Sequence, residues 1–460
     1  MRLPLPENFI NLCKNSPAPV YAVGGAVRDF LISGEISADI DVCGDLLPEA
    51  FISLAEKFGF HAVAIYKRTG TAVVTDGKRK YEYSVTREEV YPAGGAHTPQ
   101  SVTFSVGAEK DALRRDFKCN AVYYDIAGDK YIDPLDGIKD VNARVISATT
   151  LPEEVFSHDG LRLMRLARFT GELGFTVERE TLSAAKKFAG NVKDVSAERI
   201  KAELDKILHA DAAHSFSPED GHYRALKVLD ETRVLDEILP ELTLGRGMAQ
   251  RSDFHKYDVL EHSLRCACYA DEKVRLAALL HDVGKPERFI ATGKYYGHAG
   301  TGELIAKDIL TRLKYDKKTV KETCFLVKNH MLDIDGSMKE SDIKLFIAKN
   351  FDEIEKLLLI FQTDHRASME ENDVAPSVIR WRKIIDDMRK NGTPKSVKDL
   401  KITAEQLKNI GFSDKSLGKE REKLFDRCVL NSRLNDEKTL LQIATKDFAA
   451  FTRVDETLKK

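Results

Sequence analysis

Two aspartates that follow a glycine-rich turn are the residues of this sequence best placed to do chemistry. Asp39 and Asp41 are spaced i, i+2 in a β-rich segment, so on a strand both carboxylates point to one face. Upstream, the apolar run 20–23 ends at Gly24-Gly25, and glycines let a backbone approach a phosphate group closely. Paired carboxylates suit Mg²⁺ and substrate phosphates, and such metals stabilise the attacking and leaving oxygens of phosphoryl transfer. A solvated strand end would show the same Asp-x-Asp pattern.

A second group of polar side chains lies just before the β-rich run 121–125. The guanidinium groups of Arg114 and Arg115 match phosphate oxygens in a bidentate manner, and the Asn120 amide can reach a ribose hydroxyl. A surface charge cluster that caps a helix has the same composition. The residue types favour phosphate binding without requiring it.

An acid and three arginines recur at helical spacing from residue 159. They stand at i, i+3, i+6 and i+9, as Asp159, Arg162, Arg165 and Arg168. A carboxylate accepts from the exocyclic amine of cytosine or adenine, and an arginine donates to ring acceptors. These residue types can therefore read a base without a template strand. An ordinary i, i+3 salt bridge on a helix gives the same pattern.

Histidines and aspartates in the second half of the chain have the composition of a metal centre. The candidate ligands are His262, His281, Asp282, His298, His330 and Asp364. Imidazole and carboxylate together suit a divalent transition metal, which activates water for attack on phosphorus. Lys285 follows the adjacent His-Asp pair and is placed to hold a phosphate. A lone His-Asp pair is usually structural, but four further candidates on helical segments argue against chance.

The elements that must position these residues change in kind near residue 150. Before it, short β-rich runs are separated by turn signals, at 20–23, 40–42, 61–66, 72–74, 81–86, 102–104 and 121–125. From residue 152 the apolar residues recur at helical spacing to the C-terminus. The sequence predicts an α/β head on a long helical body, with a Gly/Pro-rich functional loop between residues 87 and 104.

The bulk properties are those of a cytoplasmic protein with several domains. At 460 residues the chain exceeds the size of one core, so two to four domains are expected. Charged residues interrupt the short apolar runs, and residues 1–6 lack the features of a signal peptide, so no membrane span is expected. Seven scattered cysteines indicate reduced thiols. The net charge of −2 gives no indication of nucleic-acid binding, although a nearly neutral protein can still carry a basic stripe on its surface.

The motifs of the head resemble those of a known family. Gly24-Gly25 with Arg28 and the Asp-x-Asp pair closely resemble the signature of class II tRNA nucleotidyltransferases, the CCA-adding enzymes. These enzymes share a polymerase-beta-like head with bacterial poly(A) polymerases. The run 114–121 resembles the family's second motif, and Asp159 with Arg162 resembles its base-template motif.

The resemblance continues along the chain, from residue 20 to about residue 444. Residues 196–200 resemble the next family motif, which stabilises the neck helix, and the cluster that begins at His262 resembles the HD phosphohydrolase superfamily. Three positions depart from the family pattern: Ala96 stands in place of Arg, Lys118 in place of Thr and His158 in place of Glu.

The resemblance implies a fold, with predicted boundaries. An α/β polymerase-beta-like nucleotidyltransferase head is followed by an all-α neck and body and by an α-helical HD domain. The predicted domains are residues 1–150 for the head, 151–245 for the neck and body, 246–370 for the HD domain and 371–460 for a helical tail that is a candidate for tRNA binding.

The resemblance also implies an activity, in which CTP and then ATP supply nucleotides to the 3′ end of tRNA and pyrophosphate leaves. Asp39 and Asp41 would be catalytic and hold Mg²⁺, and the HD residues would hold an unidentified divalent metal. The nucleotide-binding residues would be Gly24, Gly25, Arg28, Arg114, Arg115, Asn120, Asp159, Arg162, Arg165 and Arg168.

Several alternatives remain open. The chain could add A alone or CC alone, make poly(A), act mainly as an HD phosphohydrolase, or bind RNA with an inactive head. The loop between residues 87 and 104 argues against CC addition alone, whereas Ala96 keeps the question open. The intact pair Asp39 and Asp41 argues against an inactive head.

Overall fold

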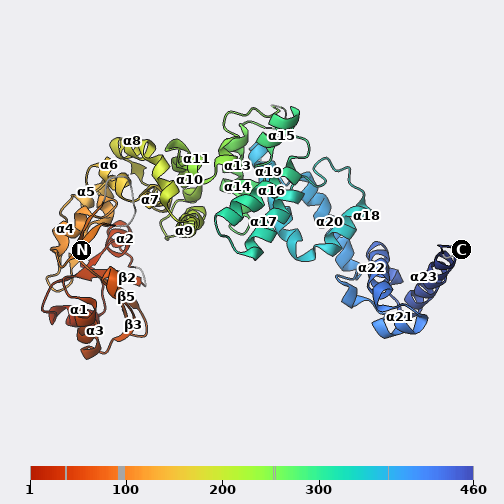
Figure 1. Ribbon diagram of the computed structural model, residues 1–460, viewed down its shortest axis with the longest axis horizontal. Helices are drawn as coiled ribbons and strands as arrows, with labels where there is room; N and C mark the ends of the chain where they lie inside the picture. The colour runs from red at the N-terminus through yellow and green to blue at the C-terminus, as the bar shows by residue number, and fades with distance from the viewer. Residues whose placement is uncertain are drawn as a thin grey trace. The chain divides into compact units, whose positions relative to one another are not determined.

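The computed structural model describes residues 2–36, 39–91, 99–251, 253, 255–370 and 372–458 (Figure 1). The chain divides into two compact units. The first contains residues 1–244 and 309–316, and the second contains residues 245–308 and 317–460. None of the described helices is both long and apolar enough to cross a membrane. The four domain boundaries given above remain a prediction.

A seven-stranded sheet forms the N-terminal part of the first unit. Its strands lie in the order β3-β4-β5-β2-β1-β8-β9, and β2 and β5 are parallel whereas all other neighbours are antiparallel. The strands are β1 (Val20–Val23), β2 (Asp39–Gly44), β3 (His61–Tyr66), β4 (Thr71–Thr75), β5 (Lys80–Val85), β8 (Tyr123–Asp125) and β9 (Lys130–Ile132). The accompanying helices are α1 (Glu7–Lys14), α2 (Gly25–Ser33), α3 (Pro48–Lys57), α4 (Gly107–Leu113) and α5 (Gly137–Ala143). Each predicted β-rich run contains a strand, which confirms the α/β head.

Alternation along β2 and β5 decides which side chains face the core. The core side of these two strands is formed by Ile40, Val42, Tyr81 and Tyr83, all of them buried. Tyr81 stacks on Phe9 of α1, with ring centroids 3.9 Å apart. Tyr83 stacks on Phe51 of α3, with ring centroids 3.8 Å apart. The residues between these positions must therefore point to the opposite face of the sheet.

A separate hairpin flanks the loop that was predicted between residues 87 and 104. Strand β6 (Arg87–Val90) pairs in antiparallel register with β7 (Ser101–Phe104). The loop is therefore shorter than predicted, because backbone pairing fixes both of its ends. Residues 92–98, which include Ala96, lie outside the described residues.

The first unit continues as helices after residue 150. They are α6 (Pro152–His158), α7 (Leu161–Leu173), α8 (Arg179–Lys187), α9 (Ala197–Leu208), α10 (Gly221–Glu231), α11 (Val234–Ile238) and α12 (Pro240–Thr243), with a short parallel pair of β10 (Val145–Ile146) and β11 (Thr176–Val177). Helices α7 and α10 meet at two glycines. A Cβ atom added at Gly171 would lie 2.4 Å from the carbonyl oxygen of Gly221, so this crossing requires glycine.

The second unit is helical, as predicted. Its helices are α13 (Val259–Tyr269), α14 (Arg275–Leu280), α15 (Lys285–Thr292), α16 (His298–Arg312, whose last turn falls in the first unit), α17 (Lys317–Asn329), α18 (Glu340–Lys349), α19 (Ile354–Met369), α20 (Pro376–Lys390), α21 (Ala404–Ile410), α22 (Asp414–Leu430) and α23 (Glu437–Leu458). Trp381 on α20 is fully buried, and its Nε1 donates to Asp333 at 2.9 Å. A hydrogen-bonded tryptophan thus lies at the centre of this helical core.

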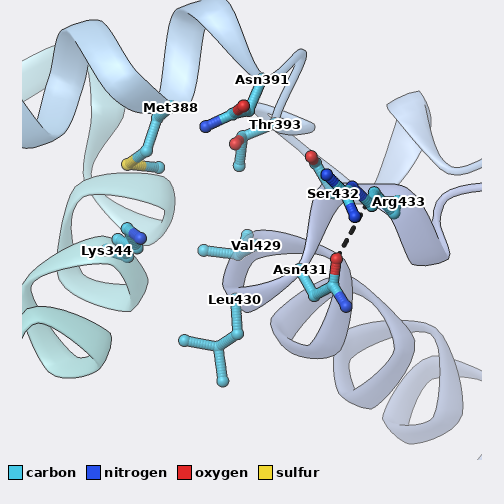
Figure 2. Close-up of a pocket in the computed structure, with 9 residues that line it drawn as sticks. All are labelled: Lys344, Met388, Asn391, Thr393, Val429, Leu430, Asn431, Ser432 and Arg433. Atoms are coloured by element: carbon cyan, nitrogen blue, oxygen red, sulfur yellow. Dashed lines mark hydrogen bonds between the residues drawn. The ribbon is translucent and has the colours of Figure 1, made fainter.

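A small polar pocket opens where α18, α20 and α22 meet (Figure 2). Its volume is about 180 Å³. Lys344 and Met388 lie on one side, and Asn431 on the other accepts a hydrogen bond from the backbone of Arg433 at 3.2 Å. The pocket belongs to the second unit alone.

The close approach of α7 and α10 predicts a sharp cost for one added methyl group. Gly171→Ala is expected to destabilise the fold by about 1–3 kcal/mol, because the carbonyl oxygen in its way is backbone and yields little. Urea denaturation measures the change. Gly190→Ala is the matched control, since its Cβ would meet nothing nearer than a Glu237 oxygen at 4.0 Å. Equal stability of the two variants would contradict the packing argument.

Candidate active site and metal centre

One cavity of the first unit, of about 650 Å³, gathers the residues predicted to bind the nucleotide. All ten of them line it, together with Asp41: Gly24, Gly25, Arg28, Asp41, Arg114, Arg115, Asn120, Asp159, Arg162, Arg165 and Arg168. Lining residues that the sequence did not single out as nucleotide ligands are Asp116, Leu161, Phe169, Glu172, Arg199, Lys206, Ala213 and His214. Residues from the sheet and from α7 thus meet around a single space.

Asp41 of β2 lines this cavity because of the alternation of side chains along its strand. Because Ile40 and Val42 are buried against the core, Asp41 points away from it and is exposed. Its carboxylate lies beside the glycine turn, where a Cβ added at Gly24 would be 3.5 Å from Oδ2. Asp39 belongs to the same strand, and its side chain lies outside what the structure describes.

A third carboxylate joins this edge through the register of the sheet. Glu82 on β5 pairs with Asp41 on β2, and its side chain is exposed. Paired residues of neighbouring strands point to the same face. The alternation of run 80–85 could have revealed Glu82, because it falls between two buried tyrosines. Carboxylates on adjacent strands fit a Mg²⁺ ion, which prefers oxygen ligands.

Buried acids hold the arginines of the cavity in place. Arg28 donates to Asp29 at 2.8 Å and to Asn120 Oδ1 at 2.7 Å. Arg114 and Arg115 both pair with the buried Asp111, at 2.7 and 3.0 Å. Burial alone would raise the pKa of Asp111, but these two arginines lower it to about 2.

Asn120, which was predicted to contact a ribose, has partners within the protein for both polar atoms of its side chain. Its Oδ1 accepts from Arg28, and its Nδ2 donates to Asp116 at 3.1 Å. Asn120 is 5% exposed. Its side chain therefore orients an arginine and an acid of the cavity.

The predicted template residues lie along α7 and at its start. Arg162 donates to the backbone carbonyls of Val155 and Arg114, and it is buried. Asp159 lies 3.3 Å from a guanidinium nitrogen of Arg199 on α9. Backbone and α9 contacts thus fix both residues at the wall of the cavity.

The remaining arginines of the stripe pair with acids from other elements. Arg165 forms a 2.6 Å ion pair with Asp116, and Arg168 forms one of 2.9 Å with Glu203 of α9. Arg28, Arg165 and Arg168 all lie over the ring of Phe169, at 5.0, 5.0 and 4.4 Å from its centroid. The arginines are therefore rigidly placed before any ligand binds.

His158, which stands where the family has Glu, forms a contact of its own. Its ring stacks on Tyr91, with centroids 4.7 Å apart and planes 9° apart. Burial and the nearby Arg162 lower the pKa of His158. Since Tyr91 directly follows β6, the stack links the base of the predicted loop to the entrance of α7.

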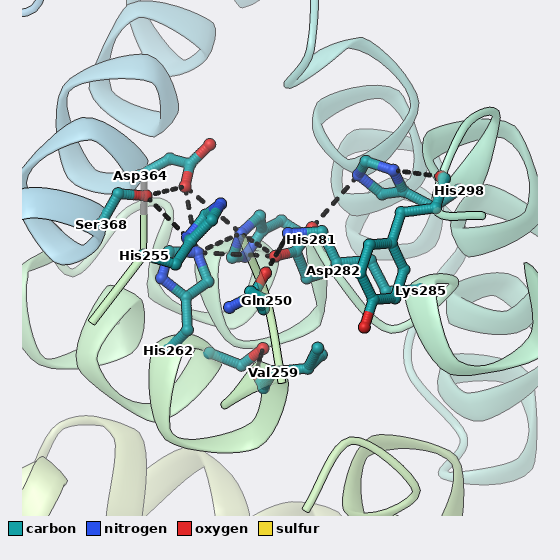
Figure 3. Close-up of polar contacts among 12 residues, drawn as sticks. Gln250, His255, Val259, His262, His281, Asp282, Lys285, His298, Asp364 and Ser368 are labelled. Atoms are coloured by element: carbon teal, nitrogen blue, oxygen red, sulfur yellow. Dashed lines mark hydrogen bonds and ion pairs between the residues drawn. The ribbon is translucent and has the colours of Figure 1, made fainter. Parts of the chain in front are cut away.

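The predicted HD residues also converge, within the second unit (Figure 3). They come from α13, α16 and α19 and from the ends of α14 and α17. Asp282 lies at the centre, with carboxylate oxygens 3.2 Å from His281, 3.2 Å from His298, 3.5 Å from His262 and 3.6 Å from His330. Asp364 lies 3.1 Å from His262. Six residues from five separate segments of the chain thus form one buried cluster.

Asp282 is held as a carboxylate at the centre of this cluster. Burial alone would raise the pKa of Asp282, but His281 and Lys285 hold it well below its usual range. Lys285 was predicted to hold a phosphate. In the structure its side chain is buried, and its Nζ forms an ion pair with Asp282 and donates a hydrogen bond to Gln250, both at 2.6 Å. The four histidines and two aspartates fit a divalent transition metal.

Sequence reasoning missed two residues of this centre. Cys266 follows His262 by one helical turn, and its sulfur lies 3.6 Å from His262 Nε2. His255 packs its ring against His262, with centroids 4.9 Å apart. The i, i+4 spacing of His262 and Cys266 on α13 was a usable signal.

The pairing of Asp111 predicts a pH-dependent stability. Because its pKa in the folded protein is about 2, below the usual 3.8, its stabilising effect is present above about pH 4 and is lost as the pH falls towards 2. Asp111→Asn is expected to cost roughly 3 kcal/mol near neutral pH, and the difference from wild type is expected to shrink by about 2 kcal/mol at low pH. Urea denaturation at several pH values measures it. The exposed Glu88→Gln is the control, and a difference that does not change with pH would refute the pairing.

Three parts of the chain match known protein families. Residues 20–147 match the poly(A) polymerase head domain. Residues 174–244 match the probable RNA and SrmB-binding site of polymerase A, and residues 259–357 match the HD domain. The first two regions contain most of the cavity lining, and the third contains most of the HD cluster.

Curated relatives and solved structures agree with these matches. The A-adding tRNA nucleotidyltransferase of Deinococcus radiodurans is 31% identical over 370 residues, which span 76% of this chain and 77% of the relative. The CCA-adding enzyme of Bacillus pumilus is 36% identical over 220 residues, which span 47% of this chain and 50% of the relative.

A solved structure shares the fold over the whole length. It is the crystal structure of the Bacillus stearothermophilus CCA-adding enzyme in complex with CTP, with a TM-score of 0.68 and 22% identity, covering 98% of this chain and 100% of that one. Together with the identity to the Deinococcus relative over most of both chains, these findings show that the chain belongs to the class II tRNA nucleotidyltransferase family and carries an HD domain.

Proposed function

We propose that this tRNA nucleotidyltransferase adds the complete CCA sequence, two C residues and then one A, to the 3′ end of tRNA. The observation that carries the proposal is the single cavity in which the strand residue Asp41, a group of arginines and the pair Asp159 and Arg162 meet. CCA-adding enzymes that share the fold have been solved with CTP, with ATP and with tRNA, which supports one site for both nucleotides.

Addition of A alone is the second candidate, because the Deinococcus radiodurans relative carries that name. The deciding experiment offers tRNA transcripts that end before CCA, after C and after CC, each with labelled CTP or ATP, and sequences the products. CCA on the shortest transcript supports the proposal. Addition of A to the CC transcript alone would overturn it in favour of the second candidate.

The chemistry follows from the lining of the cavity. The 3′ hydroxyl oxygen of tRNA loses its proton to water and attacks the α-phosphorus, a new P–O bond forms, and the bond to the bridging oxygen breaks so that pyrophosphate leaves. Asp39 and Asp41, with Glu82 beside them, would hold Mg²⁺, which supplies positive charge where negative charge develops. Arg28, Arg114 and Arg115 neutralise the triphosphate.

Base choice is assigned to α7. Asp159 accepts from the amine of cytosine or adenine, and Arg162 donates to a ring acceptor. Both bases carry an exocyclic amine and uracil does not, so this pair can accept two nucleotides and reject UTP. Arg199 holds the Asp159 carboxylate at 3.3 Å and keeps it oriented towards the base.

The acidic edge of β2 and β5 predicts a graded loss of activity. Asp41→Asn is expected to lower the rate of CTP and ATP incorporation by at least about 100-fold, and Glu82→Gln by less, because Glu82 acts from the neighbouring strand. Incorporation of labelled nucleotide under single-turnover conditions measures both. Glu88→Gln, an exposed acid of the hairpin, serves as the control. Unchanged incorporation by Asp41→Asn would exclude this site.

The template assignment predicts a change in selectivity. Arg162→Ala is expected to lower the ratio of C to U incorporation by roughly 5- to 150-fold, as a lost bidentate base contact is worth about 1–3 kcal/mol. The measurement compares kcat/KM for CTP and UTP. Lys193→Ala, whose partner Glu237 lies outside the cavity, is the control. A raised KM with an unchanged ratio would make Arg162 a structural residue, since it also bonds two backbone carbonyls.

The HD cluster supports a second activity, hydrolysis of phosphate esters. The observation that favours it is the burial of six candidate ligands, four of which are histidines that surround Asp282. A divalent transition metal bound there would activate water for attack on phosphorus. The protein's own part is to hold the ligands and to keep Lys285 beside Asp282, where it balances the acidic charge.

A substitution in one centre is predicted to remove the activity of that centre alone. Asp282→Ala is expected to abolish hydrolysis of 2′,3′-cyclic phosphates and phosphate monoesters assayed with Mg²⁺, Mn²⁺, Ni²⁺ and Co²⁺, and to leave nucleotide addition intact. Asp41→Asn should show the reverse pattern. Both assays are run on both variants. Hydrolysis by wild type no greater than that by Asp282→Ala, with every metal, would reduce the HD cluster to a structural metal site.

A further inference from the structure

A cysteine thiol lies inside the HD cluster, within reach of the same ion as its histidines. The Cys266 sulfur is 3.6 Å from His262 Nε2 and 4.0 Å from His281 Nε2. Cys266 is 1% exposed and lies one turn after His262 on α13. Its position is thus fixed by the helix that supplies the first ligand.

The four donor atoms of His262, Cys266, His281 and Asp364 have the spacing of a tetrahedral site. All lie within 4.8 Å of one another. The two imidazole nitrogens are 3.2 Å apart, and the Asp364 oxygen is 3.1 and 3.7 Å from them. A tetrahedral ion with bonds of about 2.0 Å to nitrogen and oxygen and about 2.3 Å to sulfur requires edges of about 3.3 Å, or about 3.6 Å to sulfur. Five of the six edges, those among the two histidines and Asp364 and those from Cys266 to the two histidines, agree with these values to about 0.4 Å, and the edge from Cys266 to Asp364 is within 4.8 Å.

A structural reading of Cys266 is available, because buried cysteines often pack as small apolar residues. Cys13 and Cys428 lie in the hydrophobic cores in this way. Cys266 belongs to the same core cluster as Cys428, but its sulfur also lies within 4.0 Å of the Nε2 atoms of two predicted ligands, His262 and His281. A purely apolar role does not account for a thiol between two imidazoles.

We propose that Cys266 is a metal ligand of the HD centre, and that the centre therefore takes a thiophilic first-row ion, Zn²⁺ above all. The inference rests on the metal centre proposed above and names the class of its metal. Thiolate favours Zn²⁺, Co²⁺ and Fe²⁺, whereas Mg²⁺ and Ca²⁺ prefer oxygen ligands. On binding, the Cys266 thiol releases its proton to solvent and the sulfur lone pair forms the bond to the metal.

Cobalt spectroscopy on the full-length protein tests the proposal without measuring activity. Metal-free protein is titrated with Co²⁺, and a bound thiolate produces a sulfur-to-cobalt charge-transfer band in the near ultraviolet. We expect this band in wild type and in Cys268→Ser, a control two residues along the same helix. We expect it to disappear in Cys266→Ser and Cys266→Ala, which keep the visible bands of tetrahedral cobalt. Zn²⁺ affinity should fall by more than about tenfold, the smallest loss seen when even an outer-shell partner is removed.

The possible outcomes distinguish failure of Cys266 as a ligand from failure of the proposed metal centre. Tetrahedral cobalt bands that depend on His281 but lack the charge-transfer band would overturn Cys266 as a ligand and leave the metal centre in place. Co²⁺ binding that His281→Ala does not change would overturn the centre itself. If the Cys266 variants fail to fold, X-ray absorption of the zinc-loaded wild type decides the matter. A sulfur neighbour at about 2.3 Å supports the proposal, and a shell of nitrogen and oxygen alone refutes it.

Discussion

The head of this protein depends on the two-residue alternation of strand β2. Burial of Ile40 and Val42 against the aromatic core leaves Asp41 only one direction to point, and that direction is the cavity. A shift of one residue in register would bury the carboxylate and expose the isoleucine and valine. The cost of burying a charge among stacked aromatic rings is far larger than the cost of any local distortion. The core thus fixes the position of the proposed catalytic carboxylate, which it does not contact.

The cavity also brings many positive charges close together, and ion pairs with buried acids offset their mutual repulsion. Arg28, Arg114, Arg115, Arg165 and Arg168 all line it, and each pairs with an acid that is itself largely buried. Such pairs need not stabilise the fold, since desolvation offsets much of the attraction. Their effect is to hold the guanidinium groups at the wall of the cavity, where we propose that they meet the phosphates and the base of the nucleotide. Charge at the cavity is therefore positioned by the protein before the substrate arrives.

Much of this arrangement could be predicted from the sequence, and the limits have physical causes. The strand that carries Asp41 and the helix that carries Arg162 follow from local periodicity, so both were found. For Glu82, alternation along run 80–85 gives the face of the side chain, but only strand pairing brings it beside Asp41. The contact of Asn120 with Arg28 was missed because it joins residues 92 positions apart. The local sequence pattern predicts which way side chains point, and how they are spaced, along one helix or strand. Contacts between elements depend on the whole fold.

In the HD cluster, too, local sequence identified residue types but not the contacts between segments. Histidine and aspartate were identified by type, because their chemistry is distinctive wherever they occur. Cys266 was grouped with scattered thiols, since a cysteine takes its role from its neighbours, and the neighbour His281 lies on another segment. The role of Lys285 depended in the same way on Asp282 and Gln250, which occupy its ammonium group.

The parallel pairing of β2 with β5 has a consequence for how the protein is made. The two strands meet at positions about forty residues apart in sequence, with β3 and β4 between them. Antiparallel neighbours such as β3, β4 and β5 close short loops and can pair early, whereas β2 must wait for a long loop to close. During synthesis, β2 follows its antiparallel neighbour β1 but precedes its parallel neighbour β5. The edge that carries Asp41 and Glu82 can therefore be completed only after β5 has been synthesised.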